Sequence, residues 1–323
     1  MYDIITIGSA TRDVFLQSEG FKLIKDNDFA TGQAECFALG SKLEIKKLVI
    51  TTGGGGTNTA VTFARQGFKT ACVGVVGDDS TGHELLQELR DEKVEPLFQE
   101  HGDDMTAYSA ILVNPNGERT ILSYKGEGQH FDVSKIPFDK MKAKWMYLDS
   151  LGGHYDLFEA LIKHAVDNGI KVAMNPGGKE LAHGLDKLKP LIEHIDIYTT
   201  NQEEAAGLVG INFQKEDEVF NTMAGYVKGI FVMSKGHDGV RVKAEGKEYS
   251  AGVPDSPIVE RTGAGDAFGS GFVAEYIRSG DIKKAIQFAT ANASSVVTEF
   301  GSKAGILKEG DWGPWPLVEV KVS

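Results

Sequence analysis

Thr262-Gly263-Ala264-Gly265-Asp266-Ala267, near the C-terminus, is the most informative stretch of the chain. Its small residues let the chain turn tightly with consecutive backbone amides pointing one way, and such amides bind anions. Apolar residues recur after it at roughly helical spacing, so the loop is predicted to open a helix whose N-terminus attracts negative charge. Asp266 would then lie beside the anion and accept a proton from a hydroxyl group; the alternative is an Asp that only caps the helix.

Composition restricts the class of protein. The chain has 323 residues, of which 41% are hydrophobic and 25% charged, as in ordinary globular domains. No apolar run approaches the roughly 20 residues that span a bilayer, and the N-terminus enters a strand pattern without a signal peptide, so we expect a cytoplasmic protein. A net charge of −12 argues against a nucleic-acid partner, and two cysteines, Cys36 and Cys72, argue against a disulfide framework.

Strand-like and helix-like stretches alternate through most of the chain. This alternation predicts an α/β fold with a mostly parallel central sheet, helices on both faces, and ligands beyond the carboxyl ends of the strands. The expected strands are 3–8, 71–76, 145–148, 171–175, 195–199 and 229–234, and the expected helices are 58–66, 82–92, 157–168, 202–208 and 220–227.

Two segments break the alternation and predict a second, small sheet. Residues 14–52 contain short β-like pieces, clearest at 43–51, and residues 107–124 read as a hairpin around Asn114-Pro115-Asn116-Gly117. We expect a β lid inserted into a single domain that spans 1–323, with surface decoration as the alternative. Its edge strands suggest a homodimer.

A second glycine cluster, Gly53-Gly54-Gly55-Gly56-Thr57-Asn58, precedes a predicted helix. Bare backbone there would let a polyhydroxylated ligand approach closely, and the Asn58 amide offers both a donor and an acceptor; the alternative is a flexible turn. The cluster is not a dinucleotide fingerprint, and the chain contains no GxxxxGK[ST] phosphate loop. Asp13, after the first strand, either holds sugar hydroxyls or stabilises a turn.

Two further loops follow predicted strands. Asn201 and Glu204 are three residues apart at a helix start, where they either organise the water shell of Mg²⁺ or form a capping pair. Ser234-Lys235-Gly236-His237-Asp238-Gly239 either passes along a nucleotide or makes a hairpin turn. The eight His residues show no metal-ligand spacing.

Taken together, these loops resemble the PfkB, or ribokinase-like, family of carbohydrate and nucleoside kinases. Gly54 to Asn58 and Thr262 to Phe268 resemble the family's two signatures, and Asn175-Pro176, Asn201 to Glu204 and Ser234 to Gly236 occur between them in the family's order. The resemblance spans essentially the whole chain. It implies a three-layer α/β/α fold and a Mg²⁺-dependent transfer of the ATP γ-phosphoryl group to a primary hydroxyl of a sugar.

The resemblance also implies roles for individual residues. Asp266 would be the base, with the amides of Gly263, Ala264 and Gly265 as the anion hole, and the lid would exclude water from the acceptor. The sugar-binding residues would be Asp13, Gly54, Gly55 and Asn58; Mg²⁺ and phosphate would be organised by Asn201 and Glu204; the nucleotide would be lined by Ser234, Gly236, Gly239 and Asn292.

One departure from the family concerns the residues before the glycine loop. Glu260-Arg261 stands where relatives usually carry an Asp-Thr pair that helps to bind a monovalent cation. K⁺ binding by Glu260 and Thr262 is therefore an open expectation. Arg261 either supplies fixed positive charge near the phosphates or only covers the surface.

Rival functions remain open. A nucleoside kinase is favoured by the long lid and by Phe15, Phe29 and Phe37, whose rings would stack on a base. A catalytically silent binding protein would be expected to lack Asp266 or its flanking glycines, and both are present. A dehydrogenase is disfavoured because no dinucleotide fingerprint follows the first strand.

Overall fold

A ten-stranded sheet forms the centre of the computed structural model, which describes the chain except residues 27, 30–31 and 115–117. Seven neighbouring strands, from β15 to β8, are parallel, and β16, β17 and β18 extend one edge as antiparallel strands. The mostly parallel sheet predicted from the sequence is confirmed. In spatial order the strands are β18 (Lys321–Val322), β17 (Lys247–Ala251), β16 (Val240–Ala244), β15 (Ile230–Ser234), β14 (Ile197–Asn201), β13 (Lys171–Met174), β12 (Ala143–Leu148), β1 (Tyr2–Ile7), β6 (Thr70–Val73) and β8 (Val94–Pro96).

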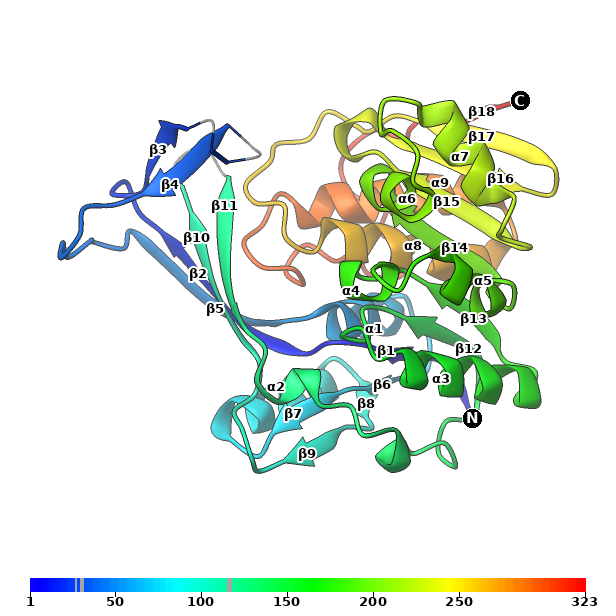
Figure 1. Ribbon diagram of the computed structural model, residues 1–323, viewed down its shortest axis with the longest axis horizontal. Helices are drawn as coiled ribbons and strands as arrows, with labels where there is room; N and C mark the ends of the chain where they lie inside the picture. The colour runs from blue at the N-terminus through cyan, green and yellow to red at the C-terminus, as the bar shows by residue number, and fades with distance from the viewer. Residues whose placement is uncertain (27, 30–31, 115–117) are drawn as a thin grey trace.

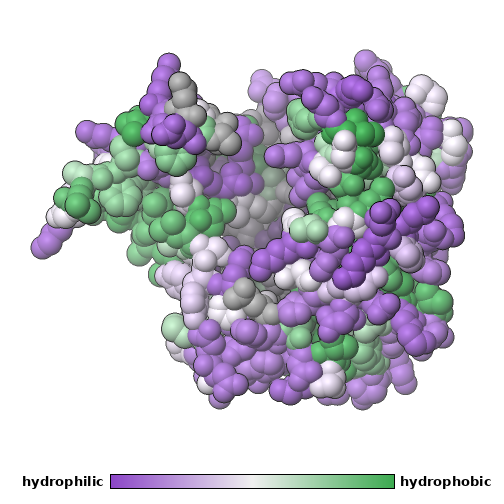
Figure 2. All heavy atoms as spheres, viewed as in Figure 1, coloured by the Kyte–Doolittle hydropathy of each residue, from purple (hydrophilic) through white to green (hydrophobic). Residues whose placement is uncertain are grey.

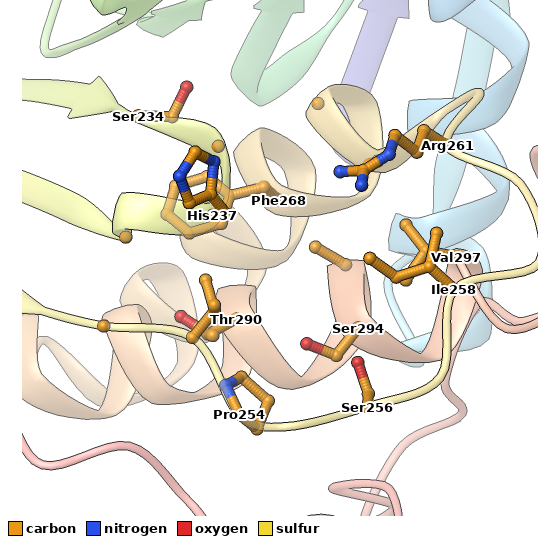
Figure 3. A pocket seen from close by; sticks show the side chains of 17 residues that line it. Ser234, His237, Pro254, Ser256, Ile258, Arg261, Phe268, Thr290, Ser294 and Val297 are labelled. Atoms are coloured by element: carbon orange, nitrogen blue, oxygen red, sulfur yellow. The ribbon is translucent and has the colours of Figure 1, made fainter. Parts of the chain in front are cut away.

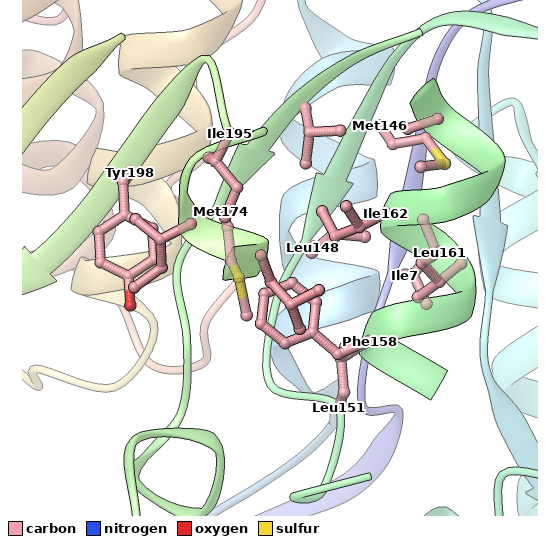
Figure 4. Packing of buried hydrophobic residues seen from close by; sticks show 14 of the residues in the cluster. Ile7, Met146, Leu148, Leu151, Phe158, Leu161, Ile162, Met174, Ile195 and Tyr198 are labelled. Carbon is pink, nitrogen blue, oxygen red and sulfur yellow. The ribbon is translucent and has the colours of Figure 1, made fainter. Parts of the chain in front are cut away.

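Helices cover both faces of this sheet (Figure 1). Side chains alternate along each strand: Met146 and Leu148 pack under α3, as Figure 4 shows, whereas Trp145 and Tyr147 pack toward α1 and α8 on the opposite face. Burial on both faces explains why these strands are nearly continuous apolar runs. The helices are α1 (Gly55–Arg65), α2 (Ser80–Asp91), α3 (Tyr155–Asn168), α4 (Gly178–Leu181), α5 (Leu185–Ile192), α6 (Gln202–Val209), α7 (Glu216–Ala224), α8 (Ala264–Ser279) and α9 (Ile282–Val296), with 3₁₀ turns η1 (Gly126–Gln129), η2 (Val133–Lys135) and η3 (Gly236–Asp238).

One predicted strand is divided in two. The run 71–76 forms β6 and then β7 (Val75–Gly77), which leaves the central sheet to pair with β9 (Gln99–His101). The division falls at Gly74, where a Cβ atom would lie 2.5 Å from the Phe98 ring. A bare backbone lets the chain change sheets at this point.

The second sheet is a four-stranded structure that projects from the body (Figure 1), and we call it the lid sheet. Its order is β11 (Arg119–Tyr124), β10 (Tyr108–Val113), β2 (Thr11–Gln17) and β5 (Lys47–Gly53), and β3 (Lys22–Lys25) pairs with β4 (Gln33–Cys36) beyond it. The expected hairpin is present as β10 and β11, although part of its turn, 115–117, lies outside the described residues. The predicted start of the lid, residue 14, lies three residues after the observed start of β2 at Thr11.

The lid sheet packs on the body through Phe300, which follows α9. The Phe15 ring meets the Phe300 ring edge-on at 6.3 Å, and Nζ of Lys47 lies 3.7 Å from the centroid of the Phe300 ring. Figure 2 shows the surface hollowed between lid and body. Among the described residues, no helix is long and apolar enough to cross a bilayer.

Candidate active site

The glycine loop before α8 adopts the conformation that its residue types allow. Gly263 has φ 80° and precedes the first residue of the helix, and a Cβ atom there would lie 2.5 Å from Cβ of Ser302. Gly265 faces open space, with no atom within 4 Å of the Cβ position that it lacks. Ala264 and Gly265, the first two residues of α8, line a cavity, and the Ala264 amide donates a long hydrogen bond to the Arg261 carbonyl (3.4 Å).

That cavity has a volume of about 330 Å³ and is shown in Figure 3. Three residues predicted to line the nucleotide, Ser234, Gly236 and Gly239, lie in its wall. The same segment also turns the chain between β15 and the antiparallel β16, so the hairpin-turn interpretation is confirmed, while its contact with a nucleotide stays a prediction. Gly239 is required by the turn, because at φ 92° a Cβ atom would lie 1.9 Å from the Ala251 carbonyl oxygen.

Sequence reasoning missed much of the cavity wall. One face of α9 contributes residues of small or moderate size at helical spacing, namely Thr290, Ala293, Ser294 and Val297 just after its end, and this spacing is the signal that would have found them. Arg261 also lines the cavity, which favours its expected role as fixed positive charge.

The prediction for Asn292 is wrong. This side chain is fully buried: Nδ2 donates to the Ala267 carbonyl (2.8 Å), and Oδ1 accepts from the Leu307 amide (2.9 Å). Its amide group ties α9 to α8 and to the chain after α9. Asn292 points between the helices and is not part of the cavity wall.

Asp266 joins the cavity to the second glycine cluster. Its Oδ2 accepts a hydrogen bond from Nδ2 of Asn58 (2.8 Å), and Oδ1 of Asn58 accepts one from Oγ of Ser302 (2.8 Å). These contacts fix the Asn58 amide orientation and hold Asp266 one residue beyond the amides that line the cavity. Burial raises the pKa of Asp266, and the Asn58 hydrogen bond and the Lys303 charge oppose that rise.

The glycine cluster is bare because two carboxylates approach it. A Cβ atom at Gly53 would lie 1.8 Å from Oδ2 of Asp13, and one at Gly55 would lie 1.7 Å from Oδ1 of Asp149. Gly54 has φ 92°, a conformation that favours glycine, and its backbone packs on Ser9. The cluster thus brings acidic groups to the N-terminus of α1.

Asp13 does not lie in a turn. It is a buried residue of β2 in the lid sheet, and its Oδ1 accepts a hydrogen bond from Oγ1 of Thr11 (2.8 Å). Burial raises the pKa of Asp13, and nearby hydroxyls and lysines oppose this. The prediction of a turn at Asp13 is wrong because β2 begins at Thr11, soon after β1 ends at Ile7, and Asp13 therefore lies within a strand.

Asp149 is a site residue that sequence reasoning missed. It follows β12 at the carboxyl end, the position where parallel sheets place their ligands, and this was the available signal. Its Oδ1 accepts from the Ser150 amide (2.7 Å), whereas its buried Oδ2 has no hydrogen-bond partner in the described part of the chain. Burial raises the pKa of Asp149 well above the ordinary value, and the Asp266 charge adds to the rise.

Lys303 is the second residue that was missed. It is 4% exposed, donates to Oγ1 of Thr52, and lies 3.6 Å from a carboxylate oxygen of Glu88. Burial lowers the pKa of Lys303, while the charges of Glu88 and Asp13 raise it. A buried ammonium beside the partly exposed carboxylate of Glu88 and near the buried Asp13 is a perturbed group of the kind found at functional sites.

Asn201 and Glu204 form the capping box that was one of their two interpretations. Oδ1 of Asn201 accepts from the Glu204 amide (2.8 Å), and Oε2 of Glu204 accepts from the Asn201 amide (2.9 Å) at the start of α6. Burial raises the pKa of Glu204. The negative charge of Glu204 also raises the pKa of Asp149, so the two carboxylates are close enough to interact electrostatically.

Glu260 is buried immediately before the glycine loop. One carboxylate oxygen accepts from the Thr262 amide (2.5 Å) and lies 3.5 Å from Nε of Arg119, a residue of the lid sheet. Burial raises the pKa of Glu260, and Thr262 and the Arg119 charge oppose the rise.

The aromatic residues expected to stack on a base do not gather at this site. Phe15 is fully buried in the core of the lid sheet, with Ile111 and Val113. Phe29 and Phe37 are about half exposed, and Phe37 packs on Phe21, 6.2 Å between ring centroids. The expectation is wrong for Phe15, because a ring without exposed surface has none to offer a ligand.

The fold is of the α/β class, with a small four-stranded sheet beside the central sheet. The chain belongs to the pfkB family of carbohydrate kinases, whose family model matches residues 1–309. It is a phosphotransferase with an alcohol group as acceptor and belongs with the sugar and nucleoside kinases.

Named relatives agree with this family. The chain is 28% identical to a ribokinase of Haemophilus influenzae over 83% of this chain and 88% of the relative. It is 25% identical to a nucleoside kinase of Methanothermobacter thermautotrophicus over 83% of this chain and 85% of the relative. An E. coli protein assigned as a ribokinase II, in complex with ATP and Mg²⁺, has the same fold, with a TM-score of 0.77, 16% identity and coverage of 95% and 96% of the two chains.

Proposed function

We propose that the protein transfers the γ-phosphoryl group of ATP to a primary hydroxyl of a sugar. The observation that carries this proposal is the start of α8. Ala264 and Gly265 line the cavity, and the next residue, Asp266, is hydrogen-bonded to Asn58 of the glycine cluster. Phosphates in the cavity and a hydroxyl at the glycine cluster would therefore meet at one carboxylate.

In this mechanism the residues position groups and move one proton. The amides of Gly263, Ala264 and Gly265 stabilise the charge of the transferring phosphoryl group, and Asp266 accepts the proton of the acceptor hydroxyl. Asp13 and Asn58 hold other hydroxyls of the sugar, and the lid sheet excludes competing water.

The residues fit a nucleotide with its metal ion. The cavity accepts a large ligand against bare backbone, and the buried Oδ2 of Asp149 is an acceptor without a hydrogen-bond partner in the described part of the chain. Mg²⁺, which prefers oxygen ligands and retains water, would be held through water by Asn201 and Glu204 and would neutralise phosphate charge. K⁺ would be held by Glu260 and Thr262, because Oε2 of Glu260 and Oγ1 of Thr262 are buried acceptors without a hydrogen-bond partner among the residues that the structure describes.

The decisive experiment is Asp266→Asn. Turnover should fall by roughly 10²–10⁴-fold because the general base is lost, while ATP affinity changes little because the cavity wall is intact. Steady-state kinetics with a panel of pentoses, hexoses and nucleosides, and calorimetry with a non-hydrolysable ATP analogue, measure both. Retained turnover would refute the role of Asp266, and a marked preference for nucleosides would replace the sugar by a nucleoside as the acceptor.

We also propose that a second copy of the chain covers the outer face of the lid sheet. Leu48 and Ile50 on β5 and Leu122 on β11 are each more than half exposed, and Figure 2 shows apolar residues gathered on the lid. A self-complementary apolar face between edge strands suits a two-fold dimer. Sedimentation should show a dimer that Ile50→Glu dissociates; a monomeric wild-type chain would contradict this.

A further inference from the structure

Lys303 is a buried cation that the proposed mechanism does not use. Among the lysines that the structure describes, it alone is buried. Its Nζ donates to Oγ1 of Thr52 on β5, and that hydroxyl donates in turn to a carboxylate oxygen of Glu88 on α2. Glu88 is partly exposed, so solvent weakens its attraction for the ammonium. A lysine is rarely buried unless opposite charge is close to it.

The contact with β5 places Lys303 next to the surroundings of Asp13. Thr52 is followed by Gly53, and a Cβ atom at Gly53 would lie 1.8 Å from Oδ2 of Asp13. Strands β2 and β5 are paired antiparallel at this point, so Asp13 is held against the same stretch of β5. The ammonium therefore approaches the first carboxylate of the acceptor region from the side of the body.

The residue before Lys303 leads to the second carboxylate. Oγ of Ser302 donates to Oδ1 of Asn58 (2.8 Å), and Nδ2 of Asn58 donates to Oδ2 of Asp266 (2.8 Å). One short stretch of chain, residues 302–303, thus reaches Asp13 through β5 and Asp266 through α1.

Asp13 and Asp266 are buried groups of like charge. Burial raises the pKa of both carboxyls, the Asp13 charge raises the pKa of Asp266 further, and the Lys303 charge lowers both pKa values. Burial also raises the pKa of the Cys72 thiol to about 12, so this neighbour of Lys303 stays neutral and does not compete for the cation. The other polar or charged groups that act on the two carboxyls or on Lys303, or whose pKa depends on Asp266, are Thr11, Asn58, Glu88, Ser109, Lys125, Tyr147 and Asp149.

We propose that Lys303 is a positioning residue that keeps Asp13 and Asp266 ionised together in the acceptor region. This inference rests on the proposed kinase function. Asp266 accepts a proton only when it is ionised, and an ionised Asp13 accepts hydrogen bonds from hydroxyls with both oxygens. Two carboxylates in one buried region oppose each other's ionisation, and a fixed cation offsets this repulsion.

The test compares Lys303→Met with Lys308→Met, which removes an exposed cation from the same segment. The dependence of kcat/KM on pH is measured with the acceptor varied. Without the cation the carboxyls bind protons more tightly, so the decline of kcat/KM on the acid side should begin at a higher pH in Lys303→Met. At neutral pH the loss should be about tenfold, and it should disappear at alkaline pH, where the carboxyls are ionised in both proteins. Lys308→Met should keep the wild-type profile.

Two further variants separate the charge from its structural contact. Lys303→Arg retains the charge and should decline at nearly the wild-type pH. Thr52→Val removes the hydroxyl contact but not the charge, so it should lower the melting temperature without moving the acid side of the profile. The proposal is overturned if Lys303→Met declines at the wild-type pH, or if Thr52→Val moves the profile as far as Lys303→Met does.

A measurement on the wild type does not depend on how well a variant folds or on turnover. Carboxyl-carbon NMR of aspartate-labelled protein, with Asp13→Asn and Asp266→Asn to assign the two signals, should show both carboxyls ionised at pH 7. A protonated Asp13 or Asp266 at that pH would overturn the role of Lys303. A wild type that phosphorylates no acceptor would refute the kinase function, while the NMR titration would still decide whether the cation keeps both groups ionised.

Discussion

The nucleotide cavity and the acceptor region differ in how they are built, although they meet at Asp266. The cavity is lined by main chain, by small or apolar side chains and by His237 and Arg261, all from residues 234–297. The proposed acceptor region collects Asp13, Asn58, Asp149 and Lys303, which come from the lid sheet, helix α1, the loop after β12 and the chain after α9, respectively. The cavity would bind its ligand mainly through its shape and its backbone amides, whereas the acceptor region would use ionisable side chains.

This difference separates two physical tasks. Phosphates are alike in every phosphoryl donor, so fixed amide dipoles can bind them without buried charge in the wall. An acceptor hydroxyl must be held and deprotonated, which requires carboxylates whose pKa values are shifted by burial and by each other. Acceptor specificity and pH sensitivity should therefore reside in the acceptor region.

Two glycine substitutions give the largest contrast between the regions. In Gly55→Ala the new Cβ would lie 1.7 Å from Oδ1 of Asp149, so the carboxylate must move. We expect a destabilisation of about 1–3 kcal/mol, typical of overpacking, and a fall of about tenfold or more in kcat/KM for the acceptor. In Gly265→Ala the Cβ enters open space, so stability is kept and only the KM for ATP rises.

Thermal unfolding and kinetics with each substrate varied measure both variants. The contrast fails if the two variants have equal melting temperatures, or if Gly55→Ala changes the KM for ATP as strongly as Gly265→Ala does.

The pH profile should sharpen the contrast next. Asp266 must be ionised to act as the base, and burial raises its pKa. On the acid side of the profile, kcat/KM should therefore begin to decline at a pH above the pKa of an ordinary aspartate. Below that pH it should fall about tenfold per pH unit. The Asn58 hydrogen bond lowers that pKa, so Asn58→Ala should move the limb to higher pH. ATP affinity should not follow the same limb. A limb near pH 4, or one unmoved in Asn58→Ala, would contradict the assignment.

The sheet could be predicted from sequence because each element carries its own signal. Continuous apolar strands and amphipathic helices are local patterns, and the glycine loop before α8 is a contiguous motif whose geometry follows from residues without side chains. The same holds for the 234–239 turn. For this reason the residues of these two loops that line the cavity could be identified from the sequence, whereas those on the face of α9 could not.

The acceptor region was less predictable because its contacts join distant residues. Asp149 and Lys303 belong to no motif, and only the fold brings them to Gly55 and Thr52. The prediction for Asn292 was wrong although the position matches the family motif. The sequence cannot reveal that Nδ2 and Oδ1 of this amide both make hydrogen bonds inside the protein, to Ala267 and Leu307. The ion pair of Arg119 with Glu260 joins positions 141 residues apart in the chain, beyond any local pattern.

The smallest expected effect is on stability and concerns Asp149→Asn. Because the pKa of Asp149 is raised in the folded state, the folded protein binds a proton more tightly than the unfolded chain, and ionisation of this group at neutral pH opposes folding. Removing the charge should therefore raise the free energy of unfolding by about 1 kcal/mol at pH 7, even as phosphoryl transfer declines. Asn retains an oxygen to accept from the Ser150 amide.

The sign of this effect has a defined pH window. The difference between variant and wild type should be full above the raised pKa of Asp149 in the folded protein, shrink as the pH falls below that value, and vanish below the pKa of an ordinary aspartate, where the folded and unfolded states are both protonated. Chemical denaturation from pH 4 to pH 8 measures it, with Asp103→Asn as an exposed control that should change little. A loss of stability in Asp149→Asn at neutral pH would mean that the carboxylate holds the glycine cluster together, and the acceptor region would then be a structural core rather than a strained binding site.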